Sequence, residues 1–127
     1  MSNHLGCIYS VAFRYYDNKS GKMATKRRPF LIIKEEEGAF PRDLTCLPVS
    51  KVTNKNRMDN YYDIRVSRKD YPLLNLNEPV SYIRSHKVQT INEKDLLLKI
   101  CDNCEYAYPD LYEDIRRKIK AFYGDIL

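Results

Sequence analysis

The sequence is poor in several residue types and patterns that mark familiar classes of protein. It contains no tryptophan, and only 4 glycines and 2 histidines among 127 residues. It has no glycine-rich phosphate loop, no internal repeat and no low-complexity tract, so a phosphate-binding loop of that kind and a solenoid are not expected. No apolar run approaches the roughly 20 residues of a membrane span, and segment 1–6 has no apolar signal core. We therefore expect one domain over residues 1–127, cytoplasmic and without a membrane partner.

The 4 cysteines do not form the spaced framework of a disulfide-rich domain. Cys7 and Cys46 lie in apolar segments and are expected to be small buried side chains. Cys101 and Cys104 form a C-x-x-C pair, but a zinc site needs a second pair of ligands at metal spacing. The other cysteines and the 2 histidines do not supply one. We expect unlinked thiols, no metal site and no cofactor, with a redox pair as the alternative.

The charge balance favours an anionic partner. Lys and Arg number 22 against 17 Asp and Glu, which gives a net charge of +5 and a pI near 9.0. A net positive charge attracts polyanions. The 11 tyrosines provide rings that can stack on bases while their hydroxyls stay hydrated.

Hydrophobic patterning predicts a mainly β (α+β) protein. Short apolar or alternating segments favour strands at 5–13, 30–34, 44–49, 61–66, 80–84 and 87–91. A helix start is expected at Asn92, and segment 96–100 is either a short helix or a strand. An apolar stripe along segment 108–124 predicts an amphipathic helix that ends at Gly124. We expect a small, strongly bent sheet or barrel with this helix packed on its side.

A run of 3 cations at positions 26–28 leads directly into the predicted strand 30–34. Pro29 has no N–H and is expected to open this strand, since a proline does not fit the middle of a central one. It also biases Arg28 towards an extended backbone. Arg28 would then hold its guanidinium beside a rigid strand, where it could bind two phosphate oxygens at once. The alternative is a solvated charge run.

Segment 14–28 is predicted to be a long loop, because turn residues cluster at 17–21. Long loops are usually functional or disordered. Basic residues beside tyrosines suit single-stranded nucleic acid, because the charges follow phosphates and the rings stack on bases. A solvated surface loop is the alternative. The candidates for such binding, in this loop and at other basic positions, are Arg14, Tyr16, Lys22, Lys26, Arg27, Lys51, Arg84 and Lys87.

Two further residues are candidates for chemistry. Pro48 lies inside the predicted strand 44–49, which favours an edge strand or a bulge that re-aims the next side chains. Ser50 follows, and its hydroxyl could donate to a phosphate oxygen or only cap a turn. His86 lies in a polar joint between two short strands. Histidine is the usual proton-transfer group near neutral pH, although an exposed joint histidine is the alternative.

A series of short motifs occurs in a fixed order along the chain. They are Gly6-Cys7-Ile8-Tyr9, Arg28-Pro29-Phe30-Leu31-Ile32-Ile33, Leu47-Pro48-Val49-Ser50, Ser81-Tyr82-Ile83-Arg84 and the Thr-Ile-x-x-x-x-Leu stretch at 90–96. Together they resemble the MazF/PemK family of toxin endoribonucleases, over most of the chain. The chain departs from the family at Cys7, where Asp is usual, and at Ser50, where Thr is common but a hydroxyl is kept.

The resemblance implies an SH3-like barrel that forms a homodimer, cleaves single-stranded RNA without a metal, and is silenced by a cognate antitoxin. In such cleavage the 2′-OH attacks the adjacent phosphorus, leaving a cyclic phosphate and a 5′-OH. The family's catalytic pair carries over to Arg28 and Ser50. His86 is a candidate for proton transfer from its residue type and not from the resemblance. Two alternatives stay open: a non-catalytic binding module on the same barrel, as in topoisomerase-poisoning toxins, and a structural domain without RNA binding.

Overall fold

The computed structural model describes residues 4–51, 55–124 and 126. The first 3 residues of the segment expected to lack a signal core lie outside this range. The strands are β1 (Ile8–Asp17), β2 (Lys22–Glu35), β3 (Asp43–Ser50), β4 (Asp63–Ser67), β5 (Val80–Arg84), β6 (Gln89–Asn92) and β7 (Leu96–Cys101). The helices are α1 (Cys104–Ala107) and α2 (Pro109–Gly124), with short 3-10 turns η1 (Lys55–Arg57), η2 (Pro72–Leu74) and η3 (Glu93–Asp95).

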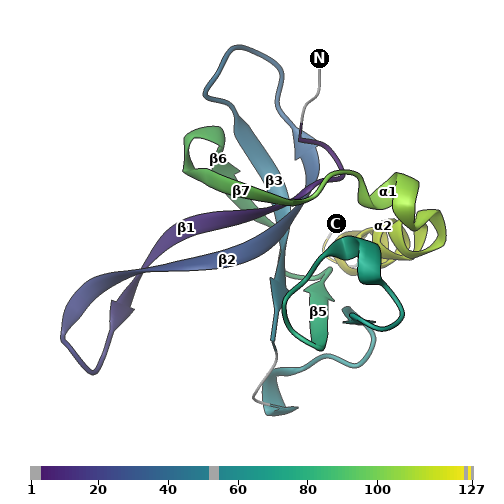
Figure 1. The fold of residues 1–127 in the computed structure, drawn as a ribbon, viewed down its shortest axis with the longest axis horizontal. Coiled ribbons are helices and arrows are strands. Elements are labelled where there is room, and N and C mark those ends of the chain that lie inside the picture. Colours follow the sequence, from purple (N-terminus) through teal and green to yellow (C-terminus); the bar gives the residue numbers. More distant parts are fainter. Residues whose placement is uncertain (1–3, 52–54, 125, 127) are drawn as a thin grey trace.

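The strands form one antiparallel sheet with the order β4-β5-β3-β2-β1-β7, and β6 also pairs with β3. The two helices lie together beside this sheet (Figure 1). The prediction of a mainly β protein with a C-terminal helix is confirmed. The end strands β4 and β7 do not pair within the described residues, so the bent sheet is open there rather than closed into a barrel.

The prediction of a loop over residues 14–28 is wrong, because this segment belongs to a long hairpin. β1 continues to Asp17 and β2 begins at Lys22, so only a tight turn separates them. The two strands stay paired up to the Asp17–Lys22 pair. Gly21 has a φ of +69° in this turn, a conformation that glycine adopts without strain. The hairpin extends away from the rest of the sheet (Figure 1).

Both strand prolines sit where one neighbouring strand is missing, which corrects two expectations. Pro29 does not open β2 but lies within it, paired with Ser10 of β1. The pairing of β2 with β3 begins only at Phe30 and Pro48, so the β3 side of Pro29 carries no ladder bond. Pro48 lies between the segment of β3 that pairs with β6 and the segment that pairs with β5. β3 is therefore not an edge strand, and its register with β2 is regular at Pro48.

Alternation along β1 and β2 divides the apolar side chains between two clusters. Ile8 and Leu31 face a cluster that includes Ile115 of α2. Tyr9 and Phe30 face a second cluster on the other side of the sheet, together with the buried Cys7 and Cys46. The predicted apolar stripe of α2 thus packs into the core. Within the described residues, no helix is long and apolar enough to cross a bilayer.

Local signals after residue 90 are resolved by the structure. The Asn92 side chain accepts a hydrogen bond from the Lys94 backbone, as expected of a cap, but the helix that it starts is only η3. Segment 96–101 is the strand β7 and not a helix.

At the other end of the chain, Gly6 has a φ of +79° and its N–H donates to the Ile32 carbonyl. A glycine adopts this positive φ without strain.

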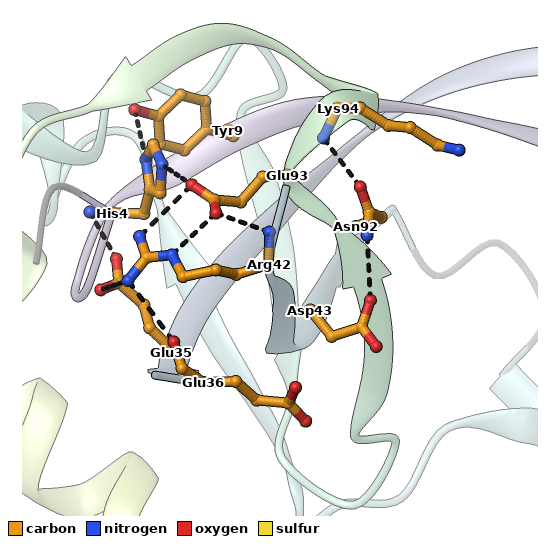
Figure 2. A network of polar contacts seen from close by, with 9 residues as sticks. All are labelled: His4, Tyr9, Glu35, Glu36, Arg42, Asp43, Asn92, Glu93 and Lys94. Atoms are coloured by element: carbon orange, nitrogen blue, oxygen red, sulfur yellow. Dashed lines mark hydrogen bonds and ion pairs between the residues drawn. The ribbon is translucent and has the colours of Figure 1, made fainter. Parts of the chain in front are cut away.

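A buried polar network ties the N-terminal segment to β2 and η3 (Figure 2). Glu93 accepts hydrogen bonds from the backbone N–H and Nε of Arg42, at 2.8 and 2.7 Å, and lies 2.8 Å from His4 Nε2. Arg42 also pairs with Glu35 at 3.4 Å, and His4 Nδ1 lies 3.1 Å from the Tyr9 hydroxyl. These groups satisfy one another, so the network anchors residues that are distant in sequence.

Candidate functional site

A cavity of about 620 Å³ lies where β2 and β3 separate. The two strands pair as far as Phe30 and Pro48. Beyond that point Val49 and Ser50 turn to pair with β5, while β2 continues along β1 alone. The cavity is lined by both diverging strands, by segment 75–78 between η2 and β5, and by β7.

The structure brings Arg28 and Ser50 to the same cavity, although 21 residues separate them along the chain. Arg27 and Lys51, two of the predicted nucleic-acid-binding residues, also line it. Arg27 and Arg28 are exposed, and Ser50 is half-buried at the end of β3. These residues therefore border a space that is open to solvent and large enough for a ligand.

Strand geometry distinguishes the two adjacent arginines. Paired residues in antiparallel strands share a face, and successive residues alternate between faces. Ser10 pairs with Pro29, and Arg27 shares their face. Arg28 pairs with the buried Val11 and belongs to the other face. Both arginines line the cavity, which opens at the unpaired edge of β2.

The cavity carries an excess of positive charge. Among the described residues, the charged groups that line it are Arg27, Arg28, Lys51, Lys99 and one carboxylate, Glu78. Lys51 Nζ lies 3.9 Å from Glu78 Oε2, and both side chains are about half exposed. A hydrogen bond from Lys99 to Asp102 raises the pKa of the lysine, so its ammonium stays protonated. Guanidinium and ammonium groups gathered at one opening suit a phosphate ligand.

Sequence patterns did not predict several lining residues. Asn75 adopts a left-handed conformation with a φ of 58°, and its side-chain amide donates to the Ile100 carbonyl at 3.1 Å. Asn77, Glu78 and Lys99 also line the cavity. Pro79, directly after Glu78, indicates a turn but not a site. Tertiary pairing brings these residues to the cavity.

His86 lies apart from this cavity, among buried groups of another cluster. It is not among the cavity-lining residues, and its side chain is only 9% exposed. It packs against the rings of Tyr62 and Phe122. Its Nδ1 is buried 3.8 Å from Asp63 Oδ1, without a hydrogen-bond partner in the described part of the chain. Burial lowers the pKa of His86, which keeps the imidazole neutral.

Arg84 belongs to the same cluster as His86. Its Nε donates to Asp63 Oδ1 at 2.8 Å, and the Asp63 side chain is fully buried. A further hydrogen bond reaches the Arg57 carbonyl at 3.0 Å. Arg84 thus compensates a buried carboxylate, while the neighbouring Lys87 is exposed. Neither residue lines the cavity.

The remaining predicted nucleic-acid-binding residues lie on the extended hairpin and not in a loop. Arg14 and Tyr16 belong to β1, and Lys22 and Lys26 belong to β2. The Lys26 ammonium lies 4.4 Å from the centroid of the Tyr15 ring. Tyr16 is 59% exposed. All of these positions are beyond the point where β2 loses β3 as a neighbour.

Other polar and sulfur groups have partners within the fold. A second cavity of about 500 Å³ borders the Glu93 network, whose charges are already paired with one another. The Cys104 thiol donates to Cys101 Sγ at 3.3 Å, which lowers the pKa of Cys101. Within residues 4–51, 55–124 and 126, no disulfide links the cysteines and no three His, Cys, Asp or Glu side chains gather as metal ligands would.

Comparison with known proteins gives one informative result. No curated protein matches the chain. A family model described as the PemK-like, MazF-like toxin of type II toxin-antitoxin systems matches residues 5–123, which includes the whole cavity and both helices up to Tyr123. A match of this extent shows the family, and this chain therefore belongs to the PemK-like, MazF-like toxins of type II toxin-antitoxin systems.

Proposed function

We propose that this toxin is an endoribonuclease that cleaves single-stranded RNA without a metal ion, leaving a cyclic phosphate and a 5′-OH. The observation that carries the proposal is that Arg28 and Ser50, on strands that diverge, line one basic cavity. The match to a toxin family supports it from the sequence side. The cut would occur at a short sequence, read by the groups around the cavity.

The cations of the cavity would stabilise the reacting phosphate. When the 2′-OH attacks the phosphorus, negative charge builds up on the non-bridging oxygens. The bond from phosphorus to the 5′-oxygen then breaks, and this oxygen takes a proton from water to become the 5′-OH. A planar guanidinium such as that of Arg28 can donate to two of the non-bridging oxygens at once. Donors already held in place are typically worth about 10²–10³ in rate. Ser50 would donate a further hydrogen bond to the phosphate or orient the 2′-OH, and Arg27 and Lys51 would hold the RNA.

The cleavage also needs a group that accepts the 2′-OH proton. Among the residues that the structure describes, Glu78 is the only carboxylate that lines the cavity, and no histidine lines it. We therefore assign proton acceptance to Glu78. Positioned bases of this kind typically contribute about 10²–10⁴ in rate. His86 is outside the cavity in a buried cluster, so it has no part in the proposed reaction.

The test is a digest of a long mixed-sequence RNA in EDTA, with cut positions mapped by primer extension and the ends assayed for a free 5′-OH. Wild type should give discrete cuts. Arg28→Ala, Ser50→Ala and Glu78→Gln should each lower the single-turnover rate, by about 10²-fold or more for Arg28→Ala and Glu78→Gln. Arg117→Ala is the control, because Arg117 is 67% exposed on α2 and does not line the cavity. Equal rates for Arg28→Ala and Arg117→Ala would remove Arg28 from the mechanism.

A non-catalytic binding module is the competing function. It would use the same basic cavity, and its binding to RNA would weaken steeply with salt. Intact RNA at high enzyme excess, with no antitoxin co-purified, would favour this module. Loss of both cleavage and salt-sensitive binding would instead indicate a structural domain.

Family membership implies a cognate antitoxin protein as a partner. We further propose a homodimer, which the resemblance to the family implies, and the cytoplasmic location expected from the sequence. Sedimentation equilibrium of the purified toxin tests the first of these. A monomer at micromolar concentration would contradict it.

A further inference from the structure

The two faces of the extended hairpin differ in what they connect to. Pairing of β1 with β2 sets Ser10 opposite Pro29, Arg14 opposite Thr25 and Tyr16 opposite Met23. Because paired residues share a face and every second residue repeats it, these side chains lie on one face, which we call the cavity face. Its other members are Ala12 and Arg27.

The cavity face is continuous with the proposed active site. Ser10, Arg27 and Pro29 line the cavity at the base of the hairpin. From Pro29 the same face runs to Met23, a distance of about 20 Å at about 3.3 Å per residue. Arg14 and Arg27 supply positive charge along it, and no acidic residue belongs to it. Both arginines are exposed.

The cavity face ends in an exposed pair of apolar side chains. Tyr16 is 59% exposed and its partner Met23 is 54% exposed. The exposed part of the Tyr16 ring gains no stability from burial, and it is a stacking surface for an unpaired base. The opposite face differs, because Tyr15 is half-buried and the Lys26 ammonium covers its ring at 4.4 Å.

We propose that the single-stranded RNA runs from the cavity along the cavity face, and that a base outside the cleavage site stacks on Tyr16. This inference rests on the proposed ribonuclease function. The arginines of this face would contact the phosphates between the cavity and the tip. The substrate would then be a single-stranded segment longer than the cavity itself, because the stacking surface is about 20 Å away.

A pair of adjacent positions tests which face binds RNA. Thr25 lies on the cavity face and Ala24, its neighbour in β2, lies on the opposite face. A glutamate at Thr25 would repel the phosphates, and a glutamate at Ala24 would not meet them. Binding of a fluorescent single-stranded RNA with one 2′-deoxy substitution at the cut position would be measured by anisotropy, with circular dichroism as the folding control. Thr25→Glu should weaken binding by about 5-fold or more, and Ala24→Glu should change it less. Equal losses would overturn the proposal.

Substitution of the tyrosine tests the stacking contact separately. Tyr16→Ala should weaken binding of the long RNA by between about 5-fold and about 150-fold, the range for loss of one base–ring contact. Tyr16→Phe keeps the ring and should restore most of the affinity. The defect of Tyr16→Ala should shrink when the RNA is shortened to the nucleotides at the cut. Wild-type affinity of Tyr16→Ala for long RNA would refute the stacking contact.

These results separate the inference from the proposed function. RNA that is cut is tested in its 2′-deoxy form, which 2′-OH attack cannot cleave, and RNA that stays intact is tested unmodified, so binding is measured whether or not the protein is a nuclease. If binding depends on the face but unmodified RNA stays intact, the nuclease function is refuted and RNA binding along the cavity face is supported. If RNA is cut but Thr25→Glu and Ala24→Glu weaken binding equally, RNA binding along the cavity face is refuted and the nuclease function is supported.

Discussion

Replacing Glu93 with glutamine would measure how strongly one buried carboxylate stabilises the fold. The Glu93 side chain is only 5% exposed and accepts hydrogen bonds from Arg42 at 2.7 and 2.8 Å. The Arg42 side chain, the first of several donors, lowers the pKa of Glu93 from 4.5 to about 2. A carboxyl with a lowered pKa stabilises the folded state when it is ionised. Its contribution is complete above about pH 4.5 and is lost as the pH falls towards 2.

The size of the effect follows from the two pKa values. A fall in pKa from 4.5 to about 2 corresponds to roughly 3 kcal/mol of unfolding free energy at neutral pH, because each tenfold change in proton affinity is worth about 1.4 kcal/mol. Glu93→Gln keeps the shape of the side chain but removes its charge, and Arg42 retains Glu35 at 3.4 Å as its partner. We therefore expect a loss of about 2–3 kcal/mol at pH 7.

The assay is urea unfolding followed by circular dichroism at a series of pH values from 7 down to 2. Wild type should lose its advantage over Glu93→Gln progressively below about pH 4.5. Glu105→Gln is the matched control, because Glu105 is 55% exposed and lies 3.5 Å from Arg116; an exposed pair of this kind is worth at most about 1 kcal/mol. Parallel curves for wild type and Glu93→Gln between pH 5 and pH 2 would refute the reasoning.

Three further predictions concern the apolar core, the ion pair of Arg84 with Asp63, and a buried thiol. Ile115 is 1% exposed in the main apolar cluster, and Ile115→Ala should lower the unfolding free energy by about 2–5 kcal/mol in the same urea assay. Arg84→Ala should cost about 3–5 kcal/mol, since it leaves the buried Asp63 without its 2.8 Å partner; a loss below about 1 kcal/mol would contradict this role. Burial raises the pKa of Cys46 to about 12, so this thiol should react with a disulfide reagent only after unfolding, as peptide mapping of the labelled protein would show.

Much of the fold could be predicted because its apolar periodicities are local. The α2 stripe and β5 could be located from the spacing of their apolar residues, since a buried face leaves a regular signal in the sequence. The hairpin leaves no such signal. Over residues 14–17 and 22–28 charged and aromatic residues face solvent on both sides of the ribbon, so alternation of apolar and polar residues is absent. The turn residues at 17–21 therefore suggested a loop over the whole of 14–28, but only a tight turn lies between the two strands.

The candidate site could be predicted in part, from sequence motifs and from positive charge. Arg28 and Ser50 were identified from short motifs, and the structure brings both to the cavity. Glu78 and Lys99 reach the same cavity through pairing of distant strands, which no local pattern records. For His86, the polar neighbourhood in the sequence does not show that the imidazole packs beside Phe122 and away from the cavity-lining residues. Chemistry inferred from residue type alone therefore needs the tertiary contacts before it can be assigned.

The adjacent arginines of β2 set a sequence motif against strand geometry. The motif assigns the catalytic guanidinium to the position before Pro29, which is Arg28. Alternation puts Arg27 on the face of Ser10, the face that the cavity occupies, and Arg28 on the face of Val11. An arginine side chain is long enough for its head group to bend around an open strand edge, and β2 has such an edge beyond Phe30. If Arg28 is catalytic, Arg27→Ala should mainly weaken RNA binding, while Arg28→Ala should lower the rate at which bound RNA is cleaved. The reverse result would move the catalytic role by one residue and leave the cavity as the site.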